Sequence, residues 1–184
     1  MLLCGTNSGP ERINLSVHKV FCVPHDLCER EEDRVTWPVE SIQPILKEAL
    51  NRGFTVVKVH SHRGGLSAFS AVDDRSDSKL FESLGSWFDE PTPVGSVVML
   101  PDGTMFGRVS CRGEIRPLER TSIAGDHIHF YGLGNLGVRA EEMRTAQAFG
   151  EGTVSLLRQL KVGVVGCSGT GSWVCELLGR NGIG

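Results

Sequence analysis

Residues 55–74 read TVVKVHSHRGGLSAFSAVDD, and this stretch decides the fold that we expect around it. Its first five residues are β-branched apart from Lys58, which is typical of a buried strand. His60 and His62 stand at the end of that strand. Side chains two positions apart in a strand point to the same face. The two imidazoles should therefore converge on one spot at the edge of a sheet.

A carboxylate returns to the two histidines over a short loop. Gly64 and Gly65 allow a sharp turn, and Ser70 and Asp73 follow His62 after eight and eleven residues. A histidine pair on a strand is more commonly just two polar residues, so the whole pattern has to carry the interpretation. Two neutral nitrogen ligands and one carboxylate make a three-ligand zinc site with a fourth position open to water, as catalytic zinc requires.

The order His-Ser-His, seven residues, Ser, two residues, Asp resembles the JAMM motif of the JAB/MPN metallopeptidases. The resemblance implies an α/β fold with a mixed, cytidine-deaminase-like sheet flanked by helices. It also implies zinc on His60, His62 and Asp73, and a hydrogen bond from Ser70 to the developing oxyanion. The substrates would be conjugates or precursors of a ubiquitin-like modifier. Arg63 stands where the family usually has proline, a change that should affect the loop more than the zinc.

The elements around the motif follow the order strand, strand, helix, strand, which matches the JAB/MPN core. Period-2 and period-3.6 patterns, with Gly53 closing the first helix, give the boundaries. Asp74 should cap the second helix rather than bind metal. His127 and His129, a second His-x-His pair, are interpreted as structural because no acidic residue follows them at a ligand-like distance. The expected strands are 1–4, 13–23, 55–59, 97–100, 104–110, 114–120 and 128–131, and the expected helices are 39–52 and 73–90.

The last part of the chain has a different character. Residues 138–160 are helical in pattern, interrupted by Gly150 and Gly152. Residues 161–165 (KVGVV) should form a buried strand, followed by a glycine-rich turn and a helix over 172–180, an order that can present a helix N-terminus to phosphates. This segment resembles the start of the ThiF/MoeB/HesA-type, ubiquitin-activating-enzyme-like adenylyltransferases. The resemblance implies ATP binding by the turn, through Gly166, Ser168, Gly169, Gly171 and Ser172.

These patterns divide the chain into a JAB/MPN-like domain (1–135), a helical linker (136–160) and the beginning of a Rossmann-like nucleotide domain (161–184). A doubly wound domain needs more strands, so we expect the sequence to be the front part of a longer fusion. In the JAB/MPN family the general base is a Glu seven residues before the glycine that Gly5 resembles, a position ahead of Met1. Either the parent protein extends upstream or the chain is a non-catalytic relative.

Composition limits the partners. The 184 residues are 40% hydrophobic and 22% charged, with a net charge of −3 and no basic block, which argues against nucleic acid and membrane surfaces as partners. No apolar run approaches the roughly 18 residues of a membrane span. No signal peptide is evident, so a cytoplasmic location is expected. The six cysteines include no C-x-x-C pair and should be reduced thiols.

The leading hypothesis is therefore a zinc-dependent isopeptidase or peptidase of a ubiquitin-like pathway, fused to an ATP-dependent adenylyltransferase through which it could dimerise. The alternative is a catalytically inactive JAB/MPN module that binds a modifier or serves as a scaffold in a ubiquitin-like or sulfur-carrier pathway. A third reading, a nucleotide-binding oxidoreductase, rests on the glycine turn alone.

Overall fold

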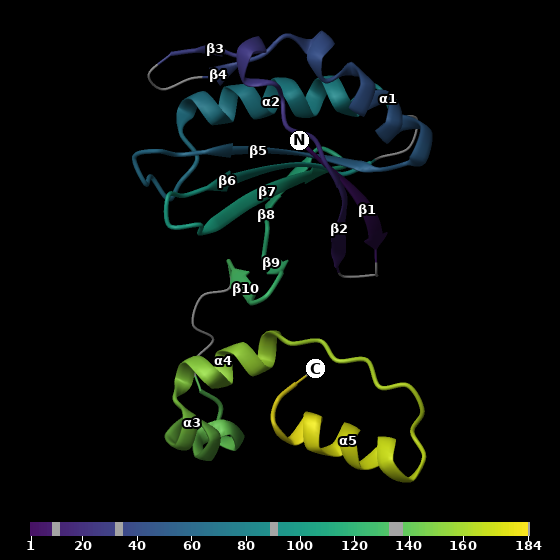
Figure 1. Ribbon diagram of the computed structural model, residues 1–184, viewed down its shortest axis with the longest axis vertical. Coiled ribbons are helices and arrows are strands. Elements are labelled where there is room, and N and C mark those ends of the chain that lie inside the picture. Colours follow the sequence, from purple (N-terminus) through teal and green to yellow (C-terminus); the bar gives the residue numbers. More distant parts are fainter. Residues whose placement is uncertain (9–11, 32–34, 89–91, 133–137, 184) are drawn as a thin grey trace. The chain divides into compact units, whose positions relative to one another are not determined.

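The computed structural model describes residues 1–8, 12–31, 35–88, 92–132 and 138–183. The chain divides into two compact units, Met1–Glu119 and Arg120–Gly184 (Figure 1). Each unit is described by itself.

The first unit is built on one mixed sheet of six strands, in the order β2-β1-β5-β6-β7-β8. Strands β5 and β6 are parallel, and every other neighbouring pair is antiparallel. The mixed sheet flanked by helices that the sequence predicts is therefore confirmed. The strands are β1 (Leu2–Ser8), β2 (Ile13–Val20), β5 (Thr55–Ser61), β6 (Val94–Met99), β7 (Met105–Cys111) and β8 (Glu114–Pro117).

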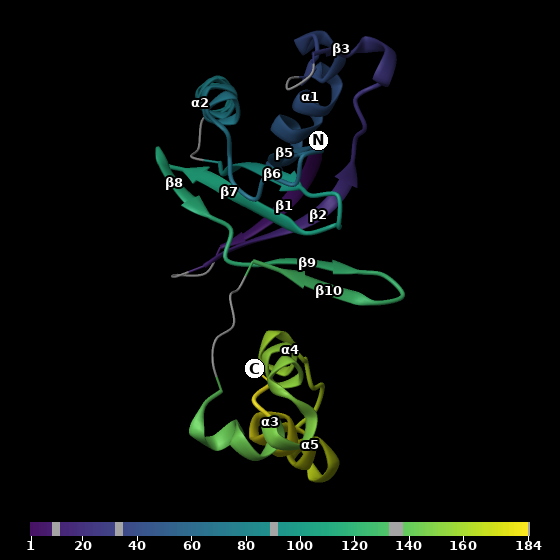
Figure 2. The same ribbon diagram turned by 90° about the vertical axis from the view of Figure 1, so that its left-hand side faces the viewer.

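Two helices, α1 (Gln43–Arg52) and α2 (Ala71–Gly85), cover the same face of this sheet (Figure 2). Helix α1 has a proline in its first turn and ends at Gly53, whose φ of 64° is the left-handed conformation that glycine adopts without strain. Short elements precede α1: the 3₁₀ turns η1 (His25–Leu27) and η2 (Val39–Ser41), and a two-stranded ribbon of β3 (Glu29–Arg30) and β4 (Val35–Thr36).

The core explains which way the side chains of β5 point. Val56 packs with Ile45, Leu46 and Leu84 of the helices, whereas Val57 packs with Cys4 and Val97 on the opposite face. Because side chains alternate along a strand, Lys58 and His60 lie on the same, helix-covered face as Val56. The motif histidines are thus directed toward α2.

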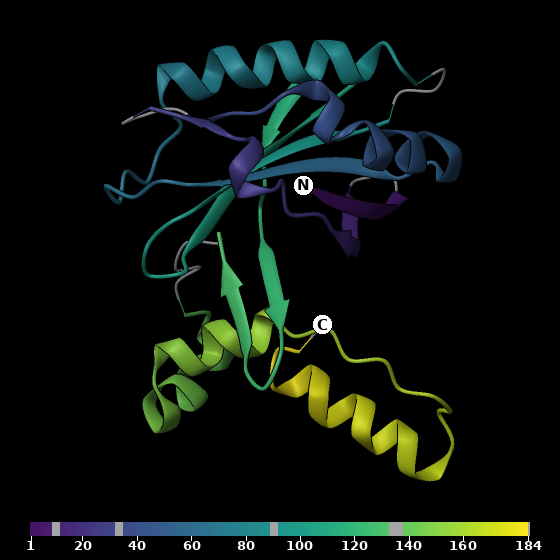
Figure 3. The same cartoon turned by 45° about the horizontal axis from the view of Figure 1, so that its top comes forward.

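The second unit contains a hairpin of β9 (Thr121–Ala124) and β10 (Ile128–Tyr131), and a group of short helices (Figure 3). The helical pattern over 138–160 is confirmed as η3 (Ala140–Glu142), α3 (Met143–Phe149) and α4 (Glu151–Gln159). Gly150, at φ 86°, separates α3 from α4, whereas the interruption expected at Gly152 is wrong, because Gly152 lies within the first turn of α4. Helix α5 (Gly169–Arg180) follows the glycine-rich turn.

The buried strand expected at 161–165 is wrong. These residues form no strand, and Val165 is fully exposed. A strand is stable only when a neighbouring strand takes up its backbone hydrogen bonds, and in the described part of this unit the strands β9 and β10 pair only with each other. The apolar, β-branched run indicates a preference for extended structure, but among the described residues of this unit no strand pairs with it.

Several boundaries also differ from those expected. Helix α2 begins at Ala71 rather than at Asp73 because Ser70 already serves as its N-cap, and it ends at Gly85. Residues 89–91, where the expected helix would have ended, lie outside the described residues. Strand β1 continues to Ser8 beyond the expected 1–4, and β8 stops at Pro117. In the part of the chain that the structure describes, no helix is long and apolar enough to cross a bilayer.

Candidate metal centre

The two histidines stand at the carboxyl end of β5. Backbone pairing with β6 continues one step past the strand, since the His62 N–H donates to the Met99 carbonyl at 3.1 Å. His62 therefore keeps the strand geometry, and its ring falls on the same side as that of His60. The two Nε2 atoms lie 3.3 Å apart. The convergence predicted from the His-x-His spacing is what the geometry shows.

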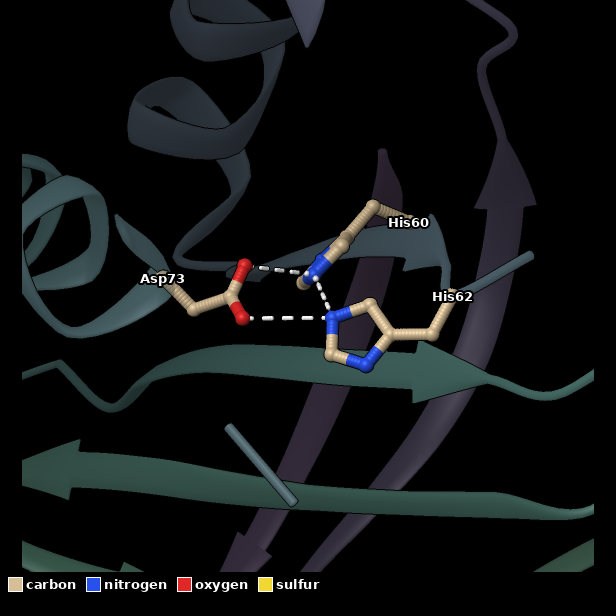
Figure 4. A group of neighbouring side chains, drawn as sticks. All are labelled: His60, His62 and Asp73. Carbon is tan, nitrogen blue, oxygen red and sulfur yellow. Dashed lines mark hydrogen bonds and ion pairs between the residues drawn. The ribbon is translucent and has the colours of Figure 1, made fainter. Parts of the chain in front are cut away.

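Helix α2 delivers the carboxylate. Ser70 caps the helix, because its hydroxyl accepts from the Asp73 N–H at 3.2 Å, while the Ser70 N–H donates to Asp73 Oδ2 at 2.7 Å. This reciprocal capping box fixes Asp73 in the first turn. Its Oδ1 lies 2.8 Å from His60 Nε2 and its Oδ2 lies 3.2 Å from His62 Nε2, so the three side chains point toward one another (Figure 4).

One nitrogen of His62 is bonded to the backbone, and the other faces the Asp73 carboxylate and His60. Its Nδ1 lies 2.9 Å from the Leu66 carbonyl oxygen, which can only accept, so Nδ1 carries the proton. In the neutral ring Nε2 then turns a lone pair toward Asp73 Oδ2, at 3.2 Å, and toward His60 Nε2, at 3.3 Å. The contact with the carboxylate is repulsive unless a proton or a metal cation lies between the two groups. A carbonyl holding the second nitrogen in this way is the usual support of a metal-ligating histidine.

The charges of His60 and Asp73 also suit a metal. Burial, followed by the charge of Lys58, holds the pKa of His60 below its usual value, so its ring is neutral near pH 7. Burial alone would raise the pKa of Asp73, but hydrogen bonds from the Ser70 hydroxyl and N–H, together with both histidines, outweigh it and lower that pKa. Two neutral nitrogens and one anionic oxygen are a donor set that zinc accepts.

The ligand atoms of His60, His62 and Asp73 all lie within 4.8 Å of one another, so this group could hold a metal ion. It is the one group of three such ligands among the described residues. His60 Nδ1 is buried and has no hydrogen-bond partner there. A shallow cleft of about 400 Å³ adjoins His62 and gives access to it from solvent. The cleft is lined by Ser61, His62, Arg63, Met99, Leu100, Pro101 and Gly103.

Next to the three ligands lies a buried ionic cluster that the sequence did not reveal. Lys58 is 4% exposed and Asp77 is 1% exposed, and the Lys58 ammonium contacts Asp77 Oδ1. Arg108 on β7 donates to Asp77 Oδ2 through Nε at 2.9 Å and Nη2 at 2.7 Å. Asp77 lies one helical turn after Asp73, so its ion pairs with Lys58 and Arg108 connect the first half of α2 to β5 and β7. The signal for this cluster in the sequence is Lys58, a charged residue within an otherwise apolar strand.

Arg108 also explains the role of Asp74. The Arg108 Nη1 donates to Asp74 Oδ1 at 2.6 Å, so Asp74 forms an ion pair with a residue of β7. The expectation that Asp74 caps the helix is wrong, because Ser70 is the N-cap residue. The guanidinium stacks on Phe69, 3.8 Å from the ring centroid. Phe69 contacts Phe106 edge to face, and Phe106 in turn approaches His62. These ring contacts connect the ionic cluster to His62, one of the three potential metal ligands.

The glycine-rich turn before α5 is tightly folded. Gly166 has φ 88°, and a Cβ added at Gly171 would lie 1.8 Å from the Gly166 carbonyl oxygen, so only glycine fits there. Ser168 is the N-cap residue of α5, Gly169 begins the helix, and the Ser172 N–H donates to the Ser168 carbonyl at 3.0 Å. The five residues predicted to bind phosphates thus gather at one helix N-terminus, without the expected strand before it.

The second histidine pair forms no comparable group. His129 lies on β10, where its ring stacks with that of Tyr131 at a centroid distance of 6.4 Å. Neither His127 nor His129 belongs to a group of three potential metal ligands among the described residues.

Comparison of the chain with protein-family models, with curated proteins and with solved structures finds no significant match.

Proposed function

We propose that this chain is a zinc-dependent peptidase or isopeptidase that acts on conjugates or precursors of ubiquitin-like proteins. The observation that supports the proposal best is the convergence of His60, His62 and Asp73, with one ring nitrogen of His62 tied to a carbonyl and the other left to face a cation. The ligand spacing, which resembles the JAMM motif, supplies the reaction class and the substrate class.

In this proposal the three ligands hold zinc at the end of β5. When bound, zinc supplies Lewis-acid polarisation of the scissile carbonyl and activation of a water molecule. Ser70 carries a hydroxyl 2.6 Å from Asp73 Oδ2, so it stands beside the ligand set and can turn to donate to the oxygen on which charge develops. The cleft beside His62 receives the extended substrate, and its position next to a ligand supports this assignment.

A non-catalytic binding module remains the second candidate, and one observation favours it. The three-ligand group contains a single carboxylate, and Asp73 is itself a ligand, so the group holds no second carboxylate that could act as general base. Hydrolysis at zinc needs such a base to take the proton of the attacking water. A module of this kind would bind zinc and a modifier tail without cutting.

The glycine turn supports an extension of the proposal. Its resemblance to ThiF-type enzymes suggests that the full adenylyltransferase domain binds ATP, activates the C-terminus of the same modifier and mediates dimerisation. The close contact between Gly166 and Gly171 supports a phosphate-type turn, since backbone must approach backbone there.

The test begins with metal content. The purified chain should take up about one zinc ion, measured by elemental analysis after dialysis against excess metal, and His60→Ala and Asp73→Asn should each lower the affinity by about 10-fold or more. His129→Ala, outside the group, is the matched control. A chain that takes up no divalent transition metal would overturn both candidates.

Cleavage then separates the two candidates. A modifier fused through its C-terminal glycine to a reporter is incubated with the zinc-loaded chain, with and without chelator. The peptidase predicts release of the reporter that stops with chelator and with His60→Ala. The binding module predicts zinc uptake and retention of the fusion on immobilised chain, with no release.

A further inference from the structure

Cys167 and Cys175 come together in the second unit, although eight residues separate them in the sequence. Their Sγ atoms lie 3.7 Å apart. A disulfide needs an S–S distance of about 2.05 Å, so the two sulfurs have to approach each other by about 1.7 Å for the bond to form. Cys167 lies in the glycine-rich turn and is exposed, and Cys175 lies within α5 and is partly buried.

The backbone holds the two sulfurs in place. The turn is closed by the contact of Gly171 with the Gly166 carbonyl, and the Ser172 N–H is bonded to the Ser168 carbonyl. Residues on either side of Cys167 are thereby fixed to the first turn of α5, the helix that carries Cys175. Both thiols are therefore presented together by the fold, at a point where small oxidants have access.

We propose that Cys167 and Cys175 form a reversible oxidation site, which hydroperoxides convert to a disulfide joining the glycine-rich turn to α5. This inference does not depend on the metal centre, because it uses only residues of the second unit. It also differs from the expectation that the cysteines remain simple reduced thiols.

The exposed thiol reacts first. Hydrogen bonding with Cys167, then burial, raises the pKa of Cys175, which keeps that thiol protonated. A hydroperoxide, ROOH, oxidises the Cys167 sulfur to a sulfenic acid and leaves as the alcohol ROH. Cys175 then attacks this sulfur, the S–S bond forms, the S–O bond breaks and the oxygen leaves as water. Two thiols and one hydroperoxide give one disulfide, one alcohol and one water.

The sequence supplies a matched control for this reaction. Trypsin cleaves after Lys161 and Arg180, so one peptide, 162–180, contains both cysteines of the site. A second tryptic peptide, 20–30, contains Cys22 and Cys28, only six residues apart. The Cys28 sulfur is instead directed to the Pro24 carbonyl oxygen at 3.4 Å. In an unfolded chain the shorter loop closes at least as easily, so a preference for the longer one must come from the fold.

The test treats the full, native chain with tert-butyl hydroperoxide, blocks free thiols with N-ethylmaleimide and analyses tryptic peptides by mass spectrometry. Peptide 162–180 should appear unalkylated and lighter by two hydrogens at a hydroperoxide dose about 10-fold below that needed for peptide 20–30. In denaturant this preference should disappear. Equal sensitivity of the two peptides in the native chain, or an alkylated 162–180 peptide at every dose, would overturn the proposal.

A variant tests the order of the steps. In Cys175→Ser no second thiol can resolve the sulfenic acid on Cys167, so dimedone should capture about 10-fold more of it than in the parent chain. In Cys167→Ser the remaining Cys175 should be labelled little. Equal dimedone capture in Cys175→Ser and in the parent would contradict the pairing, and a thiol reductant should restore both alkylation sites of the parent after oxidation.

Discussion

Ser70 has a structural task as the N-cap of α2 and a proposed chemical task beside the metal ligands. As N-cap it satisfies the Asp73 N–H, and its hydroxyl also donates to the Asp73 carboxylate at 2.6 Å. The capping alone would justify a serine at this position. Whether the hydroxyl also takes part in hydrolysis is the question that substitution can answer, because caps and oxyanion donors tolerate different side chains.

Ser70→Ala should lower the free energy of unfolding by about 1 kcal/mol, whereas Ser70→Gly, a tolerated cap, should lower it by only a few tenths. Both remove the hydroxyl, so both should slow zinc-dependent cleavage by about 10²–10³-fold, and Ser70→Thr should keep most of the rate. Urea unfolding and reporter release measure the two effects. A Ser70→Gly variant that cleaves at the parent rate would restrict Ser70 to capping.

Cys4 offers a prediction about pH. Burial raises the pKa of its thiol from about 9 to about 11. Because the folded state holds the proton more tightly than the unfolded chain, the stabilisation is complete below pH 9 and is lost as the pH rises toward 11. The expected loss is about 3 kcal/mol over that window. Urea unfolding between pH 8 and 11 should show this decline, and Cys4→Ala should lack the part due to this thiol.

Thiol labelling provides an independent check on Cys4. At pH 8 in the native chain, the exposed Cys22 should react readily with a disulfide reagent while Cys4 stays unmodified. Labelling of Cys4 as fast as Cys22 would show that β1 is not packed as described.

At the residue scale, the sequence predicted which side chains come together where their chemistry requires a particular spacing along the chain. Strand periodicity and a short return loop were enough to bring His60, His62 and Asp73 together. The ionic cluster could not be foreseen, because the partner of Lys58 lies 19 residues away on α2 and that of Asp77 lies on β7. Such pairings depend on how the elements pack, which local patterns do not encode.

At the scale of elements, α2 links the ligand set to the ionic cluster, with Asp73 and Asp77 on successive turns of one face. Asp77→Leu leaves Lys58 buried without its counter-ion, so we expect it to destabilise the fold by about 3–5 kcal/mol. Adding Lys58→Met should restore part of this loss, because an apolar pair of similar volume needs no counter-ion. Urea unfolding of the single and double variants measures the recovery.

Asp102→Asn is the matched control, since Asp102 sits in an exposed turn and its hydrogen bonds are local, among them one from the Thr104 N–H at 2.9 Å. Its effect on unfolding should stay within about 0.5 kcal/mol. A double variant Asp77→Leu/Lys58→Met less stable than Asp77→Leu alone would show that Lys58 does not need this partner.

The turn before α5 makes a second prediction at this scale. Gly171→Ala would place a methyl group against the Gly166 carbonyl, so the turn must open and amide hydrogen exchange in the first turn of α5 should accelerate. Gly179→Ala, in the same helix with open space around it, should instead slow exchange, because alanine favours the helix by about 1 kcal/mol. Slower exchange in both variants would contradict the close contact.

Helices and strands were predictable where all the residues that determine them lie within the element itself. Helix α1 follows its apolar period and ends at the expected Gly53, and Gly150 separates two helices as expected. The strand at 161–165 failed for the opposite reason. An apolar, β-branched run indicates a preference for extended backbone. A β-strand also requires a neighbouring strand that takes up its backbone hydrogen bonds, and the periodicity of a sequence does not reveal whether such a strand is present.

At the scale of the whole molecule, the arrangement of strands places the site. Side by side, β5 and β6 run parallel, and their carboxyl ends supply His60, His62 and most of the adjoining cleft. The sequence predicted a mixed sheet, but the spatial order of its six strands could not be read from it, because paired residues of strands such as β1 and β5 are 51 to 55 positions apart in sequence. The order matters for the proposed function, since it makes β1 the neighbour of the strand that carries His60.

The register of β1 against β5 gives a last prediction. Cys4 faces Thr55, Leu3 faces Val56 and Leu2 faces Val57, so each step back along β1 faces one step forward along β5. Continued by this rule, the position three residues ahead of Met1 faces Ser61, between the two histidines. In the family that the motif resembles, the catalytic Glu occupies that place, seven residues before the counterpart of Gly5. Residues that face each other in an antiparallel pair point to the same side of the sheet, so a side chain that faces Ser61 points away from His60 and His62. The register therefore favours the neighbouring position, two residues ahead of Met1, which faces His60.

A chain extended upstream by three residues, with Glu in the middle so that it faces His60, should therefore cleave the modifier fusion about 10²–10⁴-fold faster than the same extension with Gln, because only the carboxylate can take the proton of the attacking water. Zinc content should be equal in the two, since the ligands are unchanged. Moving the Glu one position away from Met1, opposite Ser61, would turn its side chain to the other face of the sheet and should abolish the gain. Equal rates for Glu and Gln at the middle position would favour the non-catalytic binding module.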